Sequence, residues 1–243
     1  MKNKFYIGCS GFAQGYWKGV FYPEDLPSKD YLSYYSQHLK TVEINSTFYR
    51  RPTSKTLEKW HDSTTEDFRF FIKIPKTITH HKRLLETKED THSFCLHISE
   101  GLKEKLAGFL FQFPATFKCS AENLERVLST INKDFVNVVE FRHDSWWTDD
   151  VLKTLKNNNI VFSGVSYPKG VPDEVMINND KLLYYRLHGI PVLFKSEYSE
   201  TELKSLAKKL KKFKGSVFVF FNNTWGTAGI KNALALQELL NED

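Results

Sequence analysis

The sequence predicts an α/β protein, a (β/α)8 TIM-like barrel formed by a single domain over residues 1–243. Eight short runs rich in β-branched and aromatic residues recur, at a spacing of roughly thirty residues that suits right-handed βαβ crossovers. Amphipathic segments such as SAENLERVLSTI lie between most of them. No Pro/Gly/Ser-rich linker interrupts this alternation. An open doubly wound sheet remains the alternative fold.

The expected strands can be placed in chain order. They are FYIGCS from residue 5, TVEINS from 41, RFFIKI from 69, LAGFLFQF from 106, NVVEFR from 137, VFSGVS from 161, LLYYRLHG from 182 and SVFVFFNN from 216. Thr53 and Ser120 are expected to cap the helices that follow them. The connection YPKGVPDEVMINND holds two prolines and no clear helical pattern, so the unit between strands six and seven is expected to be degenerate.

Composition and charge limit the class of protein. Three widely spaced cysteines indicate neither a disulfide framework nor a cysteine-rich zinc site. We see no signal peptide and no apolar run long enough for a membrane span, which favours a cytoplasmic protein without membrane contact. The net charge of +5 is too modest for a dedicated nucleic-acid binder. The lysines between residues 208 and 214 are expected on a solvated helix face.

Side-chain alternation explains why VVEFRHDSWW, residues 138–147, combines core and charge. Along a strand, Glu140 and Arg142 share one face with Val138, whereas Val139 and Phe141 point the other way. A barrel strand needs an apolar outer face against the helices, while its inner face can turn polar where the site opens. We therefore expect these charges inside the mouth, at the carboxyl ends of the strands. His143 is expected off the inner face, and the two tryptophans either shield the mouth or pack the next helix.

The same alternation places further polar side chains at the mouth. Applied to all eight runs, it predicts a ring of Ser10, Glu43, Asn45, Lys73, Gln112, Glu140, Arg142, Ser166, Arg186, His188 and Asn222. Its three cations (Lys, Arg, Arg) outnumber its two glutamates by one. Since arginine binds phosphate or carboxylate through bidentate hydrogen bonds, we expect an anionic small-molecule ligand. The alternative is that these charges are interior ion pairs that only stabilise the barrel.

Several ordered blocks of the chain resemble the YecE-like family, TIM barrels classed as domain of unknown function 72. They include IGCSGF, VEINSTFYRRP, FIKIPKTITHHKRL, VVEFRHDSWW, YYRLHG and FVFFNNTWGTAGIKNA, and together they span nearly the whole sequence. The resemblance implies the barrel fold and no established activity. It also implies that loop residues join the mouth, namely Thr47, Tyr49, Arg50, His80, Arg83 and Asn223.

An enzyme is the preferred interpretation of this mouth, acting as a hydrolase or lyase without a cofactor or metal. Glu43 or Glu140 would be the general base, provided that it lies free of a strong ion pair and burial moves its pKa toward neutrality. His188 or Lys73 would be the complementary acid, and the cations would stabilise developing negative charge. A glycosidase pair of the two glutamates is a weaker variant.

Two other functional classes stay open at this point. Metal-assisted phosphoester hydrolysis could use the glutamates with His80 and His188, although the cations at the mouth would oppose a divalent ion. The turn GTAGIKNA, at residues 226–233, opens a helix where TIM barrels often bind phosphate. Alternatively, a non-catalytic module could bind nucleic acid through FYRR and HHKR. Nothing in the sequence indicates the oligomeric state.

Overall fold

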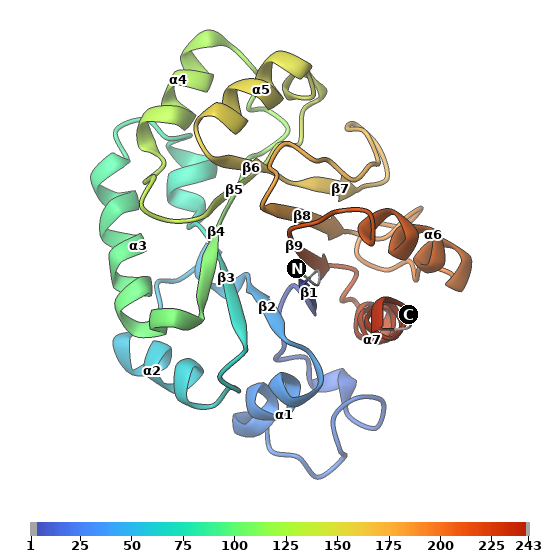
Figure 1. Cartoon of the computed structure of the whole chain (residues 1–243). Helices are drawn as coiled ribbons and strands as arrows, with labels where there is room; N and C mark the ends of the chain where they lie inside the picture. Colours follow the sequence, from blue (N-terminus) through green and yellow to red (C-terminus); the bar gives the residue numbers. More distant parts are fainter. Residues whose placement is uncertain (1–3, 242–243) are drawn as a thin grey trace.

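The computed structural model describes residues 4–241, in which strands and helices alternate as the sequence predicts. The strands are β1 (Lys4–Cys9), β2 (Thr41–Ile44), β3 (Arg69–Lys73), β4 (Leu106–Gln112), β5 (Asn137–Glu140), β6 (Ile160–Phe162), β7 (Gly164–Ser166), β8 (Leu182–Leu187) and β9 (Ser216–Phe221). The α-helices are α1 (Tyr31–His38), α2 (Ser54–Asp62), α3 (Lys88–Leu102), α4 (Ala121–Thr130), α5 (Asp149–Asn157), α6 (Glu200–Leu210) and α7 (Ala228–Asn241). Figure 1 shows the helices around the outside of the strands.

The strands pair in two parallel sheets. One has the order β1-β9-β8-β7 and the other β2-β3-β4-β5-β6. Ser10, directly after β1, forms a parallel bridge with Glu43 of β2. Only Ser163 separates β6 from β7, so the sixth predicted run forms two short strands, and each pairs with a different sheet. The protein is thus an α/β fold with parallel sheets, and all carboxyl ends within one sheet meet at the same edge.

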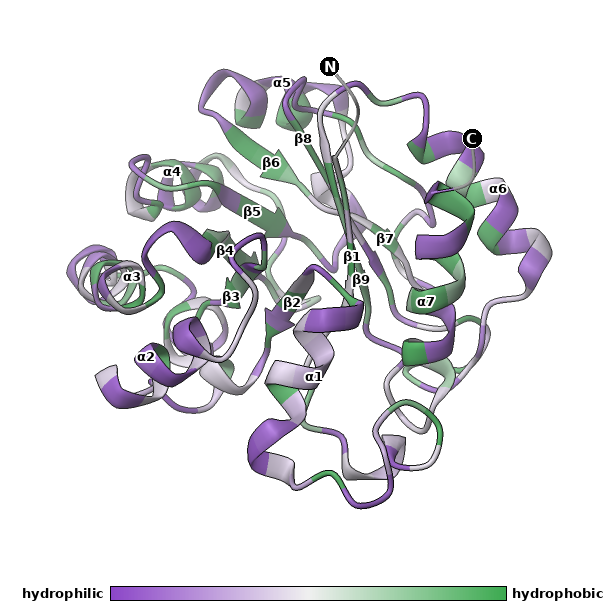
Figure 2. Ribbon diagram, turned by 60° about the horizontal axis from the view of Figure 1, so that its bottom comes forward, coloured by the Kyte–Doolittle hydropathy of each residue, from purple (hydrophilic) through white to green (hydrophobic). Residues whose placement is uncertain are grey.

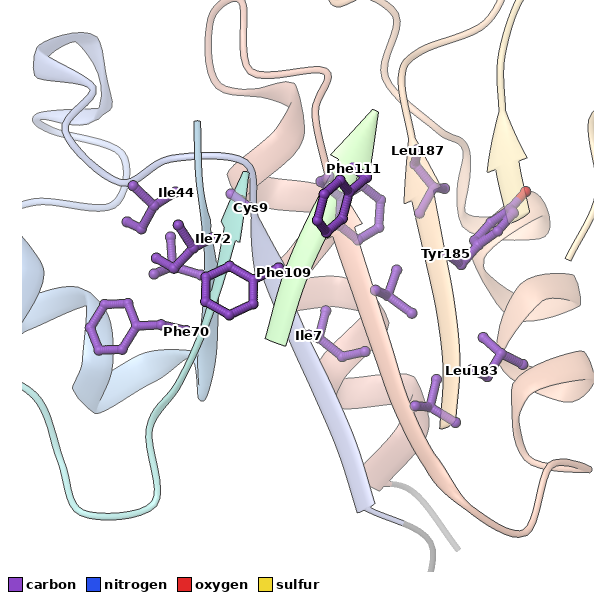
Figure 3. Packing of buried hydrophobic residues seen from close by; sticks show 14 of the residues in the cluster. Ile7, Cys9, Ile44, Phe70, Ile72, Phe109, Phe111, Leu183, Tyr185 and Leu187 are labelled. Atoms are coloured by element: carbon purple, nitrogen blue, oxygen red, sulfur yellow. The ribbon is translucent and has the colours of Figure 1, made fainter. Parts of the chain in front are cut away.

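Alternating side chains divide the core into two layers, as expected for strands with helices on one side only. Val138, Phe71 and Phe220 belong to a small apolar cluster with Leu110, Val161, Tyr184 and Phe218. The intervening residues, among them Val139 and Phe141, join the larger cluster that packs against the helices. Figure 3 shows part of this larger layer, and Figure 2 shows hydrophobic strands beside helices with hydrophilic outer turns. The predicted alternation along β5 is confirmed.

Local signals for helix ends are also confirmed. Thr53 accepts a hydrogen bond from the Thr56 amide and Ser120 accepts one from the Asn123 amide, so both residues cap helices. Ser199 caps α6 with a reciprocal contact to Glu202. No helix forms in residues 167–181, between β7 and β8. Within residues 4–241, none of the helices is long and apolar enough to span a membrane.

The close approach of β1 to β2 can be tested at Gly8. A Cβ atom at this position would lie 2.0 Å from the Thr41 carbonyl oxygen and 3.0 Å from the Tyr35 hydroxyl. Since backbone must shift to admit it, we expect Gly8→Ala to lower the free energy of unfolding by about 1–3 kcal/mol in urea denaturation. Gly15→Ala is the matched control, because, apart from its own chain neighbours, no described residue places an atom within 4 Å of its added Cβ. Equal stability of the two variants would show that β1 and β2 are not packed this closely.

Candidate functional site

Two buried carboxylates share one arginine at the carboxyl ends of the strands. Arg186, on β8, donates from Nη2 to Glu43 Oε1 and from Nη1 to Glu140 Oε2, each at 2.6 Å. All three side chains are at most 1% exposed. These residues come from β2, β5 and β8, far apart in sequence. The fold therefore brings together the charges that the sequence assigned to one mouth.

Each carboxylate has further donors. Glu43 Oε1 accepts from Ser10 Oγ at 2.6 Å and Oε2 accepts from the Tyr184 hydroxyl at 2.6 Å. The Tyr184 contact was not anticipated, although this residue shares the inner face of its strand with Arg186. On the other side, Glu140 Oε1 accepts from Arg142 Nε. Because buried charge is costly unless hydrogen-bonded, this set of donors makes the burial of both glutamates tenable.

His188 joins the network beside Arg142. Its Nε2 accepts from Arg142 Nη2 at 3.1 Å, and its Nδ1 lies 2.9 Å from the Asn222 amide. Burial and the two nearby arginines, Arg142 and Arg186, hold the His188 pKa well below its usual value. His188 is therefore a neutral imidazole near pH 7. Tyr167 covers the arginine, with the Arg142 guanidinium 4.0 Å from its ring centroid.

Glu140 does not meet the condition set for a general base. Burial opposes its ionisation, but Arg142 and Arg186 outweigh it and hold the Glu140 pKa well below the usual range. A carboxylate held by two arginines stays ionised near pH 7 and accepts protons poorly. The expectation of a free carboxylate with raised pKa is therefore wrong for this residue. Its partners, which lie two and forty-six residues away, could not be chosen from sequence alone.

Lys73 forms no salt bridge with this network in residues 4–241, but the charges of the network affect its pKa. Its Nζ lies 4.3 Å from the centroid of the Phe48 ring and, within residues 4–241, forms no salt bridge. Burial and Arg186 lower the Lys73 pKa to about 8, while Glu43 and Glu140 oppose the change. His80 packs edge-on against Phe48 at 4.9 Å. Burial, then the nearby Lys73, lowers the His80 pKa to about 4.

The loop residues lie at varied distances from this centre. Tyr49 is 74% exposed and contacts Phe48, while Arg50 and Arg83 are exposed. The Asn45 Oδ1 atom is buried and has no hydrogen-bond partner among residues 4–241. Thr47 donates to the carbonyls of Ile44 and Lys73 and thus supports the backbone. Of these residues, Thr47 contacts the backbone of Lys73, and Tyr49 packs against the Phe48 ring on which the Lys73 amine lies.

Gln112 keeps its predicted face, because it follows inward-facing Leu110 by two residues and pairs in register with Glu140; its amide donates to the Phe113 carbonyl. Two other polar residues are not placed as the sequence analysis expected. Asn223 binds Ser196 and Asn232 instead of the network. Ser166 accepts from the Tyr198 hydroxyl, within the helix-facing layer. The expectation for Ser166 was wrong because Val161 faces inward, so a two-residue period puts Ser163, not Ser166, on the inner face.

The adjacent tryptophans have a packing role, which settles one of the open alternatives. Trp146 is fully buried, stacks on Phe141 at 3.9 Å and donates to the Phe117 carbonyl. Trp147 packs edge-on against Phe162. His143 contacts Ser145 and lies outside the network, as expected. The lysines at 208, 209, 211, 212 and 214 are exposed, also as expected.

The shared arginine should be essential for stability. We expect Arg186→Met to lower the free energy of unfolding by about 3–5 kcal/mol, because it leaves two buried carboxylates without their common counter-charge. Urea denaturation measures the effect. Arg126→Met, which removes the partner of the exposed Glu122, is the control and should change stability by less than about 1 kcal/mol. A similarly small loss for Arg186→Met would contradict the buried arrangement.

The lowered Glu140 pKa predicts a specific acid response. Since its folded pKa lies below its unfolded value of about 4.3, the ionised carboxylate stabilises the fold above roughly pH 5, and this contribution declines as the pH falls further. Glu140→Gln should therefore lose less stability than the wild type between about pH 5 and 3. Identical slopes for Glu140→Gln and the wild type would refute the assignment.

Comparisons with known proteins agree with this architecture. The family model described as "Protein of unknown function DUF72" matches residues 6–243. UPF0759 protein YunF of Bacillus subtilis is 28% identical over 97% of this chain and 94% of its own length. The match to UPF0759 protein YecE of Escherichia coli K12 is 29% identical and covers 56% of this chain and 50% of YecE.

Solved structures give the same result. A DUF72 family protein from Thermotoga maritima superposes with a TM-score of 0.87 at 32% identity, over 99% of this chain and 100% of that one. D-psicose 3-epimerase from Clostridium cellulolyticum has a TM-score of 0.53 at 11% identity, over 98% of each chain, a likeness of fold alone. The fold is therefore TIM-like, and the chain belongs to the DUF72 family.

Proposed function

We propose that the protein binds, and chemically transforms, a small molecule bearing a phosphate or carboxylate group at the carboxyl ends of its strands. The observation that carries this proposal is the charge balance. Glu43 and Glu140 are matched by Arg142 and Arg186, whereas Lys73 forms no salt bridge with any carboxylate in residues 4–241. An anionic group on the ligand would supply the counter-charge for Lys73.

The cations divide into two roles. Arg186 is 1% exposed, and both of its terminal nitrogens donate to carboxylates. In this proposal it holds the two carboxylates in place and does not bind the ligand. Arg142 is 11% exposed and keeps its Nη1 without a hydrogen-bond partner among residues 4–241. Arg142 and Lys73 would contact the anionic group of the ligand. They replace Arg186, which the sequence analysis expected to bind it.

Lys73 is also the group best suited to move a proton near neutral pH. General acid–base catalysis is most efficient when the pKa of the catalytic group lies close to the working pH. The Lys73 pKa of about 8 meets this condition, whereas the His80 pKa of about 4 and the depressed Glu140 pKa do not. Glu140 and His188 would act by holding Arg142 in place, and Glu43 by holding Arg186.

A closed barrel would explain why the network forms. We infer that the two sheets make one eight-stranded barrel, a single domain in which β6 and β7 are halves of the sixth strand. The Ser10–Glu43 bridge and the single residue between β6 and β7 support closure at both seams. The helix-free segment 167–181 supports a degenerate unit before β8.

The other functional classes receive less support. Residues 4–241 contain no group of three His, Cys, Asp or Glu side chains arranged to hold a metal ion, which gives metal-assisted phosphoester hydrolysis no ligand set. Exposed Tyr49 and Arg50 are compatible with stacking on nucleic acid. Salt-sensitive binding of single-stranded DNA, without binding of small anions, would favour that class instead.

Calorimetric titration with inorganic phosphate tests the proposal. We expect the wild type to bind phosphate, and Lys73→Met to weaken binding about tenfold or more, because a charge-assisted contact contributes roughly 1.5–3 kcal/mol. Lys153→Met, on the exposed face of α5, should bind like the wild type. Phosphate binding that is absent, or equal in all three proteins, would overturn the proposal.

A further inference from the structure

We propose that Lys73 is a nucleophile, and that its amine forms an imine with a carbonyl group carried by the anionic substrate. This inference rests on the proposed function and names the bond that the site makes. It identifies the substrate class as a carbonyl compound with a phosphate or carboxylate group. Lys73 combines a position at the network with freedom from salt bridges to the carboxylates of residues 4–241.

The position of Lys73 leaves its amine available. It ends β3, at the same edge of the sheet as Glu43 and Glu140, and its half-buried side chain lies along the Phe48 ring. By contrast, the buried Lys105 amine donates to the carbonyls of His61 and Thr64 and is needed to hold the fold. Other lysines, such as Lys40 and Lys156, form exposed ion pairs.

The groups that face Lys73 are both cationic and anionic. Arg186 from β8 and Arg142 after β5 disfavour its ammonium form, while Glu43 from β2 and Glu140 from β5 favour it. His80, from the segment after β3, is neutral near pH 7 because its own pKa falls to about 4. Burial has the largest effect and brings the Lys73 pKa to about 8. In roughly a tenth of the molecules the Lys73 side chain is then a neutral amine at pH 7. This fraction is far larger than for a solvated lysine.

The chemistry balances without a co-reactant. The amine lone pair forms a C–N bond to the carbonyl carbon as the C–O π bond breaks, giving a carbinolamine. This intermediate then loses its oxygen as water, and the product is a protonated imine. Overall, the ammonium nitrogen loses two protons, which leave with the carbonyl oxygen. Desolvation next to cationic groups is an established way to activate a lysine for this step.

The roles of the neighbours follow from the network. Arg142, whose Nη1 has no hydrogen-bond partner among the described residues, would hold the anionic group of the substrate while Lys73 attacks the carbonyl carbon. The fixed carboxylates of Glu43 and Glu140 would stabilise the positively charged imine that results. The same site therefore accepts an anionic substrate and favours a cationic covalent intermediate.

Reductive trapping tests the inference. The full chain is incubated with pyruvate or dihydroxyacetone phosphate, with acetone as the neutral control, and then reduced with sodium borohydride. Intact mass and peptide mapping locate the stable secondary amine. We expect an adduct with at least one anionic probe, about tenfold more abundant at Lys73 than at Lys76. We also expect its formation to rise as the pH increases from 7 to 8.5.

Matched variants separate this inference from the proposed function. Lys73→Arg keeps the charge but removes the primary amine, so it should form no adduct. Lys76, which lies 5.4 Å from the Tyr49 ring, is the control, and Lys76→Arg should retain the adduct. Phosphate binding without any Lys73 adduct would overturn the imine while leaving the proposed function standing. Equal labelling of Lys73 and Lys76 would also overturn the imine. If the wild type neither bound phosphate nor formed the adduct, both proposals would be refuted.

Discussion

Arg186 forms one ion pair with Glu43 and one with Glu140, and the rest of the site depends on this shared contact. It joins β2, β5 and β8 and allows two carboxylates to be fully buried in a parallel strand layer. Without that shared charge, each glutamate would either take up a proton or require a different partner. Because Arg186 and Arg142 together pair with both carboxylates, Lys73 is the cation at this edge that forms no salt bridge within residues 4–241.

The two layers of the core make this arrangement possible. Large aromatic and aliphatic side chains face the helices, while Phe71, Tyr184 and Phe220 fill the inner cluster below the polar network. Tyr184 belongs to both, since its ring packs on Phe71 and its hydroxyl donates to Glu43. Apolar packing and the polar network thus meet at Tyr184, which links the inner cluster to Glu43.

Sequence periodicity predicted most of the fold and the members of the network, because a two-residue period determines which side chains share a face. It failed at Ser166, where β6 gives way to β7, because the inward face there falls on Ser163. It also could not show that Arg142 and Arg186 both bind Glu140, since hydrogen-bond partners depend on distances between strands that no sequence pattern encodes. Phe48 and Tyr167 were missed for a related reason: they lie in connections, where no period applies.

We infer that Lys73 carries a charge that no carboxylate in residues 4–241 matches. Its side-chain 13Cε resonance, assigned with Lys73→Arg and followed by NMR from pH 6 to 11, measures this directly. We expect a midpoint near the pKa of about 8 in the free protein, and a higher midpoint when phosphate is bound, because the anion favours the ammonium form. A midpoint at the ordinary lysine value of about 10.4, unchanged by phosphate, would contradict the account.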